Sequence, residues 1–240
     1  MRRAPPLATV VPFPVVEAAW RLALVPGLLA AVTLPFAPPV GIGFAALTIG
    51  VLWFHRDPTR TPPGPDRAVV SPADGTVQVV SEEGTRLRVG VFMNVTDVHV
   101  NRAPIAGTVR EVRHRPGANR PAFTKESDRN EQVVIDLGAY EVIVIAGWFA
   151  RRIHPHVEVG DELERGDRVG HVSFGSRADV VLPAAVDRED LLAAPGDAVR
   201  AGETLVPGLP TGAEGSPDRE CGGRGDEGES QRPRRVGCGS

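Results

Sequence analysis

Lysine and cysteine are scarce in this chain, and their scarcity excludes several catalytic groups. Lys125 is the only lysine among the 240 residues, which disfavours a pyridoxal phosphate enzyme, because such enzymes hold their cofactor as a lysine Schiff base. A lipoyl- or biotinyl-type carrier domain also needs a lysine to modify, and Lys125 lies far before the Gly-Asp turns of residues 159–170 that fit such a domain. Cys221 and Cys238 both lie in the polar C-terminal stretch, so neither a disulfide framework nor a thiol nucleophile is indicated.

The chain also lacks an excess of positive charge. Lys and Arg number 27 against 30 for Asp and Glu, which gives a net charge of −3. Proteins that bind nucleic acid usually present a basic face, so the charge balance offers no electrostatic argument for such a partner. The length allows one or two domains, and a hydrophobic content of 42% allows a real core.

Charged side chains are absent from residues 22–54, and this gap indicates a membrane segment. The run exceeds the ~20 residues of one spanning helix, and Pro35, Pro38 and Pro39 interrupt it near the middle. We therefore predict an N-terminal transmembrane helical hairpin with helices over 15–34 and 40–54, the alternative being a pair of buried core helices. Arginines flank the hairpin, so the positive-inside tendency places both of its ends, and the domain that follows, on the cytoplasmic side of the cell membrane.

Beyond Ala68 the pattern changes to short β-branched runs between turn residues, which predicts a mainly β domain with an antiparallel sheet. The predicted strands cover 69–70, 76–80, 86–92, 132–137, 141–146, 171–174 and 178–182. A short helical turn is expected over 188–192. The organisation is thus a membrane-anchoring hairpin and junction over 1–60, a β-rich domain over 61–207, and a polar tail over 208–240 whose composition predicts disorder.

The bond between Gly175 and Ser176 can generate a reactive carbonyl from the chain itself. Glycine has no Cβ to crowd its own carbonyl, so the Ser176 hydroxyl could attack the Gly175 carbonyl carbon and convert the amide into an ester. β-Elimination would release the upstream chain and leave dehydroalanine, which hydrolyses to a pyruvoyl group and ammonia. The alternative is an ordinary Gly-Ser turn.

Four segments, in this order, resemble those of the phosphatidylserine decarboxylase family. They are Ser71–Gly75, Phe92–Pro104, Arg129–Glu131 and the stretch around the Gly-Ser bond at 166–183. His55–Pro58 resembles the junction after the membrane anchor in the family's short, archaeal-type branch. Together these matches extend over residues 54–185.

The resemblance implies a proenzyme that cuts itself between Gly175 and Ser176. The products would be a β chain of residues 1–175 and an α chain of residues 176–240, which stay together as a heterodimer. Ser176 would supply a covalent pyruvoyl cofactor that holds the amine of phosphatidylserine as a Schiff base. The enzyme would then decarboxylate this membrane lipid to phosphatidylethanolamine.

His99 and Asp74 are the residues that the resemblance implies as catalytic beside Ser176. The unperturbed pKa of imidazole, about 6.5, lets His99 move protons near neutrality during Ser176 activation or decarboxylation. Asp74 would orient and electrostatically support a general base, as in Ser-His-Asp arrangements. The alternatives are a structural histidine and a Pro-Ala-Asp-Gly turn.

Arg102 stands where long-branch members of the family carry a second histidine. The identity of the self-cleavage base therefore stays open: either His99 serves both steps or another group substitutes. Arg102 could bind the lipid phosphate or the substrate carboxylate through its fork of donors, or could form a surface ion pair. Arg129, Asn130 and Glu131 are expected to shape the substrate site by hydrogen bonding.

His154 and His156 would share one face of a strand, but no third ligand has a recognisable spacing, so no metal is predicted. Three alternative functions remain open at this stage. They are decarboxylation of a related seryl lipid such as archaetidylserine, a non-enzymatic membrane-anchored β domain that stays uncut, and a carrier domain modified at Lys125.

Overall fold

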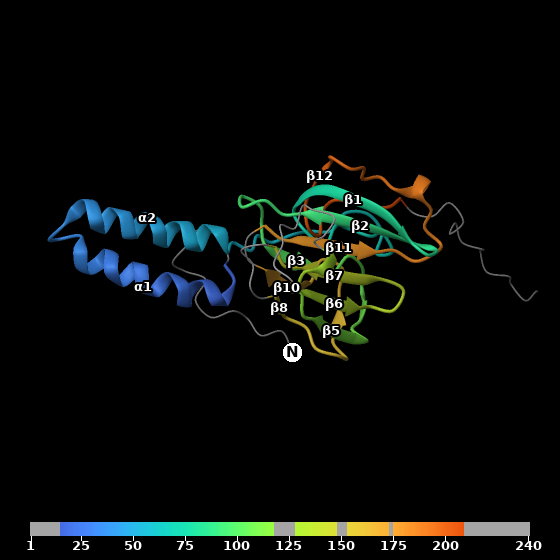
Figure 1. Cartoon of the computed structure of the whole chain (residues 1–240), viewed down its shortest axis with the longest axis horizontal. Coiled ribbons are helices and arrows are strands. Elements are labelled where there is room, and N and C mark those ends of the chain that lie inside the picture. Colours follow the sequence, from blue (N-terminus) through green and yellow to red (C-terminus); the bar gives the residue numbers. More distant parts are fainter. Residues whose placement is uncertain (1–14, 118–127, 148–152, 173–174, 209–240) are drawn as a thin grey trace, which may run out of the picture.

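The chain forms a helical hairpin that projects from a β domain (Figure 1). The computed structural model describes residues 15–117, 128–147, 153–172 and 175–208. Lys125, the two cysteines and residues 209–240 of the tail lie outside the described residues. Within the described ranges, the predicted mainly β, antiparallel fold is confirmed.

The hairpin consists of α1 (Glu17–Thr33) and α2 (Pro38–Phe54), which pack along each other. Pro35 lies in the turn between them, as predicted. Pro38 and Pro39 instead occupy the first turn of α2, where a proline lacks no needed N–H and its φ already suits a helix. The second helix therefore begins earlier than the sequence pattern predicted.

The lengths of the two helices do not support the prediction that this hairpin spans a membrane. Each helix has 17 residues, or about 26 Å at a rise of 1.5 Å per residue, whereas the hydrocarbon core of a bilayer is ~30 Å thick. In the described part of the chain, no helix is both long and apolar enough to cross a membrane.

A seven-stranded antiparallel sheet forms the centre of the β domain, in the order β12-β1-β2-β11-β7-β6-β5. Its strands are β1 (Gly75–Glu83), β2 (Arg86–Phe92), β5 (Glu111–Arg115), β6 (Gln132–Asp136), β7 (Glu141–Ile145), β11 (Arg177–Val181) and β12 (Ala198–Val199). The predicted strands within this sheet are confirmed to within a few residues. β5 was missed because its sequence, Glu-Val-Arg-His-Arg, is mostly charged, which an edge strand tolerates.

Two smaller sheets complete the domain. One has the order β3-β10-β8 and the other pairs β4 with β9. These strands are β3 (Val100–Arg102), β4 (Gly107–Thr108), β8 (Ile153–Pro155), β9 (Glu162–Leu163) and β10 (Arg168–Val172). Of the remaining predictions, the helical turn is confirmed as η2 (Arg188–Asp190), whereas residues 69–70 form only an isolated bridge between Val70 and Leu205.

Both faces of the large sheet bury apolar side chains, and the face with the smaller cluster, Val134, Ile143, Ile145 and Val181, also buries a carboxylate. One face packs on a valine-rich core to which the small sheets also contribute, including Val89, Val91, Val133, Val144, Val169 and Val180. On the other face, the fully buried Asp179 accepts hydrogen bonds from Arg88 (2.6 Å) and from Arg177 (2.9 Å). Gly90 faces this carboxylate on β2, where an added Cβ would lie 2.7 Å from it.

Asp179→Asn is expected to lower the free energy of unfolding by about 3–5 kcal/mol, because it leaves two buried guanidinium groups short of their shared counter-charge. Urea unfolding followed by circular dichroism would measure the change. Asp66→Asn, at an exposed site, serves as the control. A loss equal to that of the control would contradict the structural role of this carboxylate.

Candidate active site

The register of the large sheet brings separate sequence segments to one end of the sheet. A single row across five strands comprises Thr76, Phe92, Arg177, Ile145 and Gln132. The chain positions next to this row are Gly75, Met93, Ser176, Ala146 and Glu131. Main-chain hydrogen bonds continue the pairing there, from the Met93 N–H to the Ser176 carbonyl and from the Ala146 N–H to the Glu131 carbonyl, each 2.9 Å. Three of the four segments singled out in the sequence therefore meet beside Ser176.

Ser176 lies immediately before β11 and is fully buried. Among the described residues, its Oγ has one hydrogen-bond contact, the sulfur of Met93 at 4.0 Å, and a thioether is only a weak acceptor. Gly175 has a φ of +63°, and an added Cβ at this position would meet nothing within 4 Å. This left-handed conformation is open to glycine at little energetic cost, so the residue is needed for its backbone rather than for space.

His99 is buried and offers one free ring nitrogen. Its Nδ1 lies 2.9 Å from the Asp97 carbonyl oxygen, which can only accept, so Nδ1 carries the proton and Nε2 carries the lone pair. That Nε2 is buried and has no hydrogen-bond partner in the described structure. Burial lowers the pKa of His99 to about 4, although the Asp97 carbonyl and carboxylate oppose the shift. The imidazole is therefore neutral at pH 7 and suited to accept a proton.

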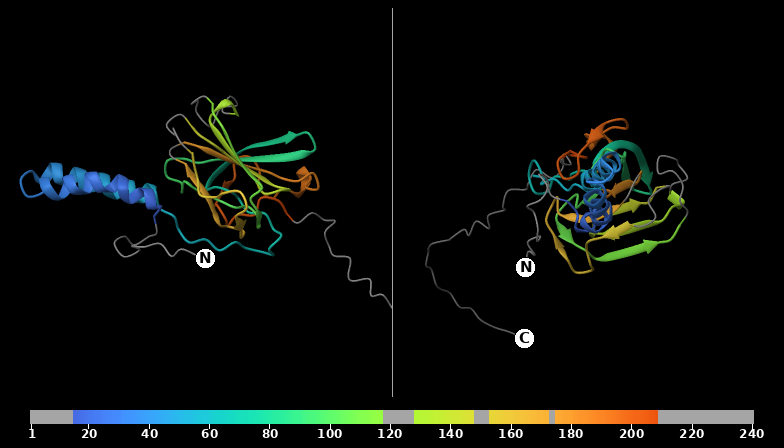
Figure 2. Two further views of the ribbon diagram at one scale, coloured as in Figure 1. Left: turned by 90° about the horizontal axis from the view of Figure 1, so that it is seen from below. Right: turned by 90° about the vertical axis from the view of Figure 1, so that its left-hand side faces the viewer.

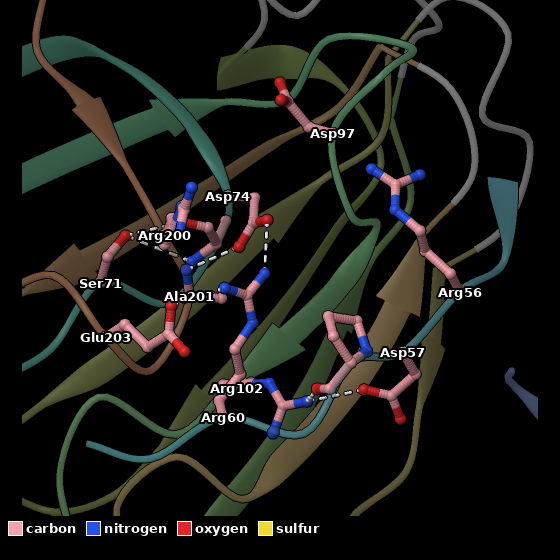
Figure 3. A network of polar contacts seen from close by, with 12 residues as sticks. Arg56, Asp57, Arg60, Ser71, Asp74, Asp97, Arg102, Arg200, Ala201 and Glu203 are labelled. Atoms are coloured by element: carbon pink, nitrogen blue, oxygen red, sulfur yellow. Dashed lines mark hydrogen bonds and ion pairs between the residues drawn. The ribbon is translucent and has the colours of Figure 1, made fainter. Parts of the chain in front are cut away.

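Asp74 is held by two elements distant in sequence (Figure 3). The Ala201 N–H donates to one carboxylate oxygen at 2.7 Å, and Arg60 donates to the other at 2.8 Å. Arg60 also pairs with Glu203 at 2.7 Å. Burial raises the pKa of Asp74, while the Ala201 hydrogen bond and the Arg60 charge act in the opposite direction.

Within the described residues, no hydrogen bond joins Asp74 to His99. The two side chains instead have separate partners, Arg60 and Ala201 for Asp74 and the Asp97 carbonyl for His99. Direct orientation of this imidazole by Asp74, as in a Ser-His-Asp arrangement, is therefore not what the structure records.

Arg102 is engaged in a buried ion pair. Its Nη2 donates to Asp57 at 2.6 Å and to the Pro58 carbonyl at 2.8 Å, and its Nη1 donates to the Gly166 carbonyl at 2.8 Å. Arg168 pairs with the same Asp57 carboxylate. The Arg102 guanidinium group was expected to bind lipid phosphate or substrate carboxylate. It instead connects the junction after α2 to the β domain (Figure 3).

The segment of Arg129, Asn130 and Glu131 lies at the same end of the sheet as Ser176. Asn130 is buried and donates to the Ala146 carbonyl at 2.8 Å. Glu131 accepts from His114 at 2.9 Å, and Arg129 is exposed. The side chains of Asn130 and Glu131 therefore form hydrogen bonds within the protein, and their role in shaping a substrate site stays a prediction.

The end of the hairpin touches the candidate base. The Phe54 ring, at the end of α2, lies 4.5 Å from the His99 ring between centroids. A groove of about 490 Å³ between α1 and α2, lined by Leu22, Val25, Leu29, Leu47 and other apolar side chains, ends at Phe54 and His55. An apolar groove therefore runs along the hairpin as far as Phe54, whose ring packs on His99.

His154, His156 and His171 form a second imidazole cluster. His156 Nε2 and His171 Nδ1 share a hydrogen bond of 2.7 Å, and the His154 and His171 rings stack with centroids 4.8 Å apart. In the ranges that the structure describes, no group of three or more His, Cys, Asp or Glu side chains is arranged to hold a metal ion.

This cluster predicts a loss of stability in mild acid. Burial, followed by the neighbouring imidazoles, lowers the pKa of His171 to about 4. A histidine in the unfolded chain titrates near 6.5, so the unfolded state binds more protons between these values. The free energy of unfolding should therefore fall as the pH drops from about 6.5 toward 4, by about 1–2 kcal/mol after allowance for partial hydration of the ring.

Urea unfolding at several pH values would measure this dependence. His171→Leu should make the decline smaller, and the remainder is expected from His99, whose pKa burial also lowers to about 4. His114→Gln, at an exposed histidine, should retain the full decline. Equal slopes for the two variants would contradict the assignment to His171.

Sequence reasoning missed several residues of this site. Arg60, Ala201 and Glu203 were not predicted, since Arg60 and Glu203 lie 143 positions apart and nothing local links them. Phe54 was interpreted only as part of an apolar helix. Asn101 lay inside a matched segment but received no role, although its place two residues after His99 was a usable signal.

Comparisons with known proteins all identify the same family. A family model described as "Phosphatidylserine decarboxylase" matches residues 47–207. A Halobacterium salinarum protein named "Putative archaetidylserine decarboxylase proenzyme" is 55% identical over 188 residues, covering 78% of this chain and 95% of that protein. A Streptomyces avermitilis "Phosphatidylserine decarboxylase proenzyme" is 49% identical over 156 residues, covering 63% of this chain and 72% of that protein.

Proposed function

Since the chain belongs to the phosphatidylserine decarboxylase family, we propose that it is a proenzyme that cuts itself between Gly175 and Ser176 and then decarboxylates phosphatidylserine to phosphatidylethanolamine. The observation that carries the proposal is the meeting of Ser176 with the Asp74–Gly75, Met93 and Asn130–Glu131 segments at one end of the sheet. A chance Gly-Ser turn would have no reason to lie there.

The surroundings of Ser176 fit the formation of a pyruvoyl group at this residue. The hydroxyl is fully buried and bonded only weakly, to the Met93 sulfur, so little has to be broken before it attacks the Gly175 carbonyl. The glycine at 175 leaves that carbonyl uncrowded. Once formed, a pyruvoyl group supplies a carbonyl that captures the substrate amine and accepts the electron pair released with carbon dioxide.

His99 is the residue we assign to proton transfer. Its Nε2 is a buried, unpartnered acceptor in the described structure, so it can take the proton from Ser176 Oγ without giving up another bond. The Asp97 carbonyl holds the ring in the tautomer that this step requires. Asp74 acts as a positioning residue, because it links Arg60 of the junction to the Ala201 backbone across the site.

The architecture also suits a chain that is cut and stays assembled. β11 starts directly after Ser176 and pairs with β2 on one side and β7 on the other. β12 pairs with β1, and Ala201 bonds Asp74. An α chain of residues 176–240 would therefore remain bound to a β chain of residues 1–175 as a heterodimer.

The hairpin is suited to bring the enzyme to its lipid. Large apolar side chains stand exposed along it, among them Leu24, Val25, Val32, Phe36, Ile42 and Ile49, and the hairpin stands clear of the β domain (Figure 2). We assign these side chains to insertion into the cytoplasmic leaflet of the cell membrane, which keeps the β domain at the surface where the serine head lies. The groove that ends at Phe54 and His55 then faces a lipid chain.

Archaetidylserine is the second candidate substrate. The Halobacterium salinarum relative that covers 78% of this chain carries that substrate in its name. Both lipids have the same serine head group. The residues at the end of the sheet are proposed to bind this head group rather than the lipid tails.

The test is a decarboxylation assay with the detergent-extracted, cut protein and each of the two lipids in mixed micelles. Release of carbon dioxide from phosphatidylserine at a kcat/KM at least equal to that for archaetidylserine supports the first assignment. The reverse preference supports the second. A folded protein that stays uncut and releases none from either lipid would favour a non-enzymatic membrane-anchored β domain.

A further inference from the structure

Asn101 is a buried amide with an end that nothing in the described structure satisfies. It lies on β3 opposite Gly170 of β10 and has no exposed surface. Its Nδ2 has one contact, the sulfur of Met93 at 3.7 Å, and its Oδ1 has no hydrogen-bond partner among the described residues. Exchanging the two ends of the amide would leave the NH2 group unpartnered instead, so one end is free in either orientation.

Such an orphaned group calls for a physical reason, because burying a polar atom without a partner is unfavourable. The other buried asparagine of the site, Asn130, shows the usual outcome, since its amide donates to the Ala146 carbonyl at 2.8 Å. A buried polar group without a protein partner is explained by strain, a catalytic role, or a bound water, ion or ligand.

The Asn101 amide and the Ser176 hydroxyl share one neighbour. The Met93 sulfur that contacts Asn101 Nδ2 also contacts Ser176 Oγ, at 4.0 Å. Asn101 follows His99 by two positions, and the His99 carbonyl continues the pairing with β10 through the Val172 N–H at 3.2 Å. Side chains two positions apart on an extended chain share a face, so Asn101 and His99 point to the same side.

We propose that Asn101 is a substrate-binding residue whose Oδ1 accepts a hydrogen bond from the amino group of the serine head and holds that nitrogen beside the carbonyl carbon at position 176. The inference rests on the proposed function. It follows from the donors available, because the carboxylate, phosphate and ester oxygens of a serine lipid only accept, and the amino group alone donates. Orienting this nitrogen allows the bound amine to attack the carbonyl carbon at position 176.

Asn101→Leu separates this role from a structural one. The substitution removes an unsatisfied acceptor and keeps a similar volume, so the thermal unfolding midpoint should stay unchanged or rise. Asn130→Leu is the matched control, and its midpoint should fall because it removes a satisfied amide. If the midpoint of Asn101→Leu falls as far as that of Asn130→Leu, Asn101 is structural and the proposal fails.

Head-group capture gives the functional readout. The cut protein is mixed with dihexanoyl phosphatidylserine and sodium cyanoborohydride, whose hydride fixes the captured amine to the carbon at position 176. Mass spectrometry of the C-terminal fragment then gives the fraction that carries the head group. We expect Asn101→Leu to be cut as the wild type is, and to show about a tenfold lower rate of capture.

The outcomes separate the two proposals. Capture at the wild-type rate overturns the role of Asn101 alone, and so does failure of Asn101→Leu to be cut, which would assign the residue to self-cleavage. A wild-type protein that yields no C-terminal fragment beginning with a pyruvoyl group overturns the proposed function and this inference with it.

Discussion

Ser176→Ala is expected to leave a single uncut chain of 25.5 kDa and to abolish decarboxylation entirely. The wild type should yield two fragments, residues 1–175 and 176–240, the second beginning with a pyruvoyl group. The effect is total because the Ser176 oxygen is both the attacking atom and the source of the new carbonyl. Alanine keeps the buried position filled apart from one oxygen atom, whose hydrogen-bond contact within the described structure is the weak one to the Met93 sulfur, so the fold should persist.

Intact mass spectrometry of the detergent-extracted proteins measures this directly, and circular dichroism shows that the variant is folded. Ser173→Ala is the matched control, since it removes a hydroxyl three positions upstream and should still be cut. Cleavage of the Ser176→Ala protein, or an uncut wild type with native circular dichroism, would contradict the assignment of the Gly175–Ser176 bond as the cleavage site.

His99→Ala is expected to slow self-cleavage by about 10²–10⁴-fold, the range typical of losing a general acid or base. The free Nε2 is the structural reason, because a buried acceptor without a partner is available for the Ser176 proton. The time course of fragment formation after refolding, followed by gel electrophoresis, gives the rate. His154→Gln, at an exposed ring, should be cut as fast as the wild type.

The same residue predicts the pH dependence of cleavage. Burial lowers the pKa of His99 to about 4, and a base acts in its deprotonated form, so the rate should stay constant from neutral pH down to about 5 and fall only as the pH approaches 4. A rate that already halves near pH 6.5 would assign the proton transfer to a group with an ordinary histidine pKa. Circular dichroism at each pH separates this loss from unfolding.

Uncut His99→Ala protein would also clarify the role of Arg102. Long-branch relatives carry a second histidine at the matching position, whereas the guanidinium here is held by Asp57, Pro58 and Gly166. Because those contacts occupy both terminal nitrogens, we expect no second proton carrier at this position. Self-cleavage and decarboxylation would then share His99.

Local patterns in the sequence were sufficient to predict the hairpin and most strands of the large sheet, and to single out the Gly175–Ser176 bond as the proposed cleavage site. The hairpin followed from an uncharged run broken by prolines, and strands such as β2 followed from β-branched runs between turns, because both signals act over a few neighbouring residues. The pair Gly175–Ser176 was found because its chemistry needs only adjacent atoms. The prediction that the hairpin spans a membrane found no support, because in the described part of the chain no helix is both long and apolar enough to cross one.

Only the tertiary structure decided which of these residues touch. Strand register, set by the burial of whole faces of the sheet, aligned Ser176 with Met93 and Gly75. The packing of loops outside the strands paired Arg60 with Glu203, 143 positions away. The sequence showed that Asn101 was present, but not that one end of its amide would be left without a partner. Whether a buried polar atom has a hydrogen-bond partner depends on all the groups around it in space. A sequence pattern does not show which groups those are.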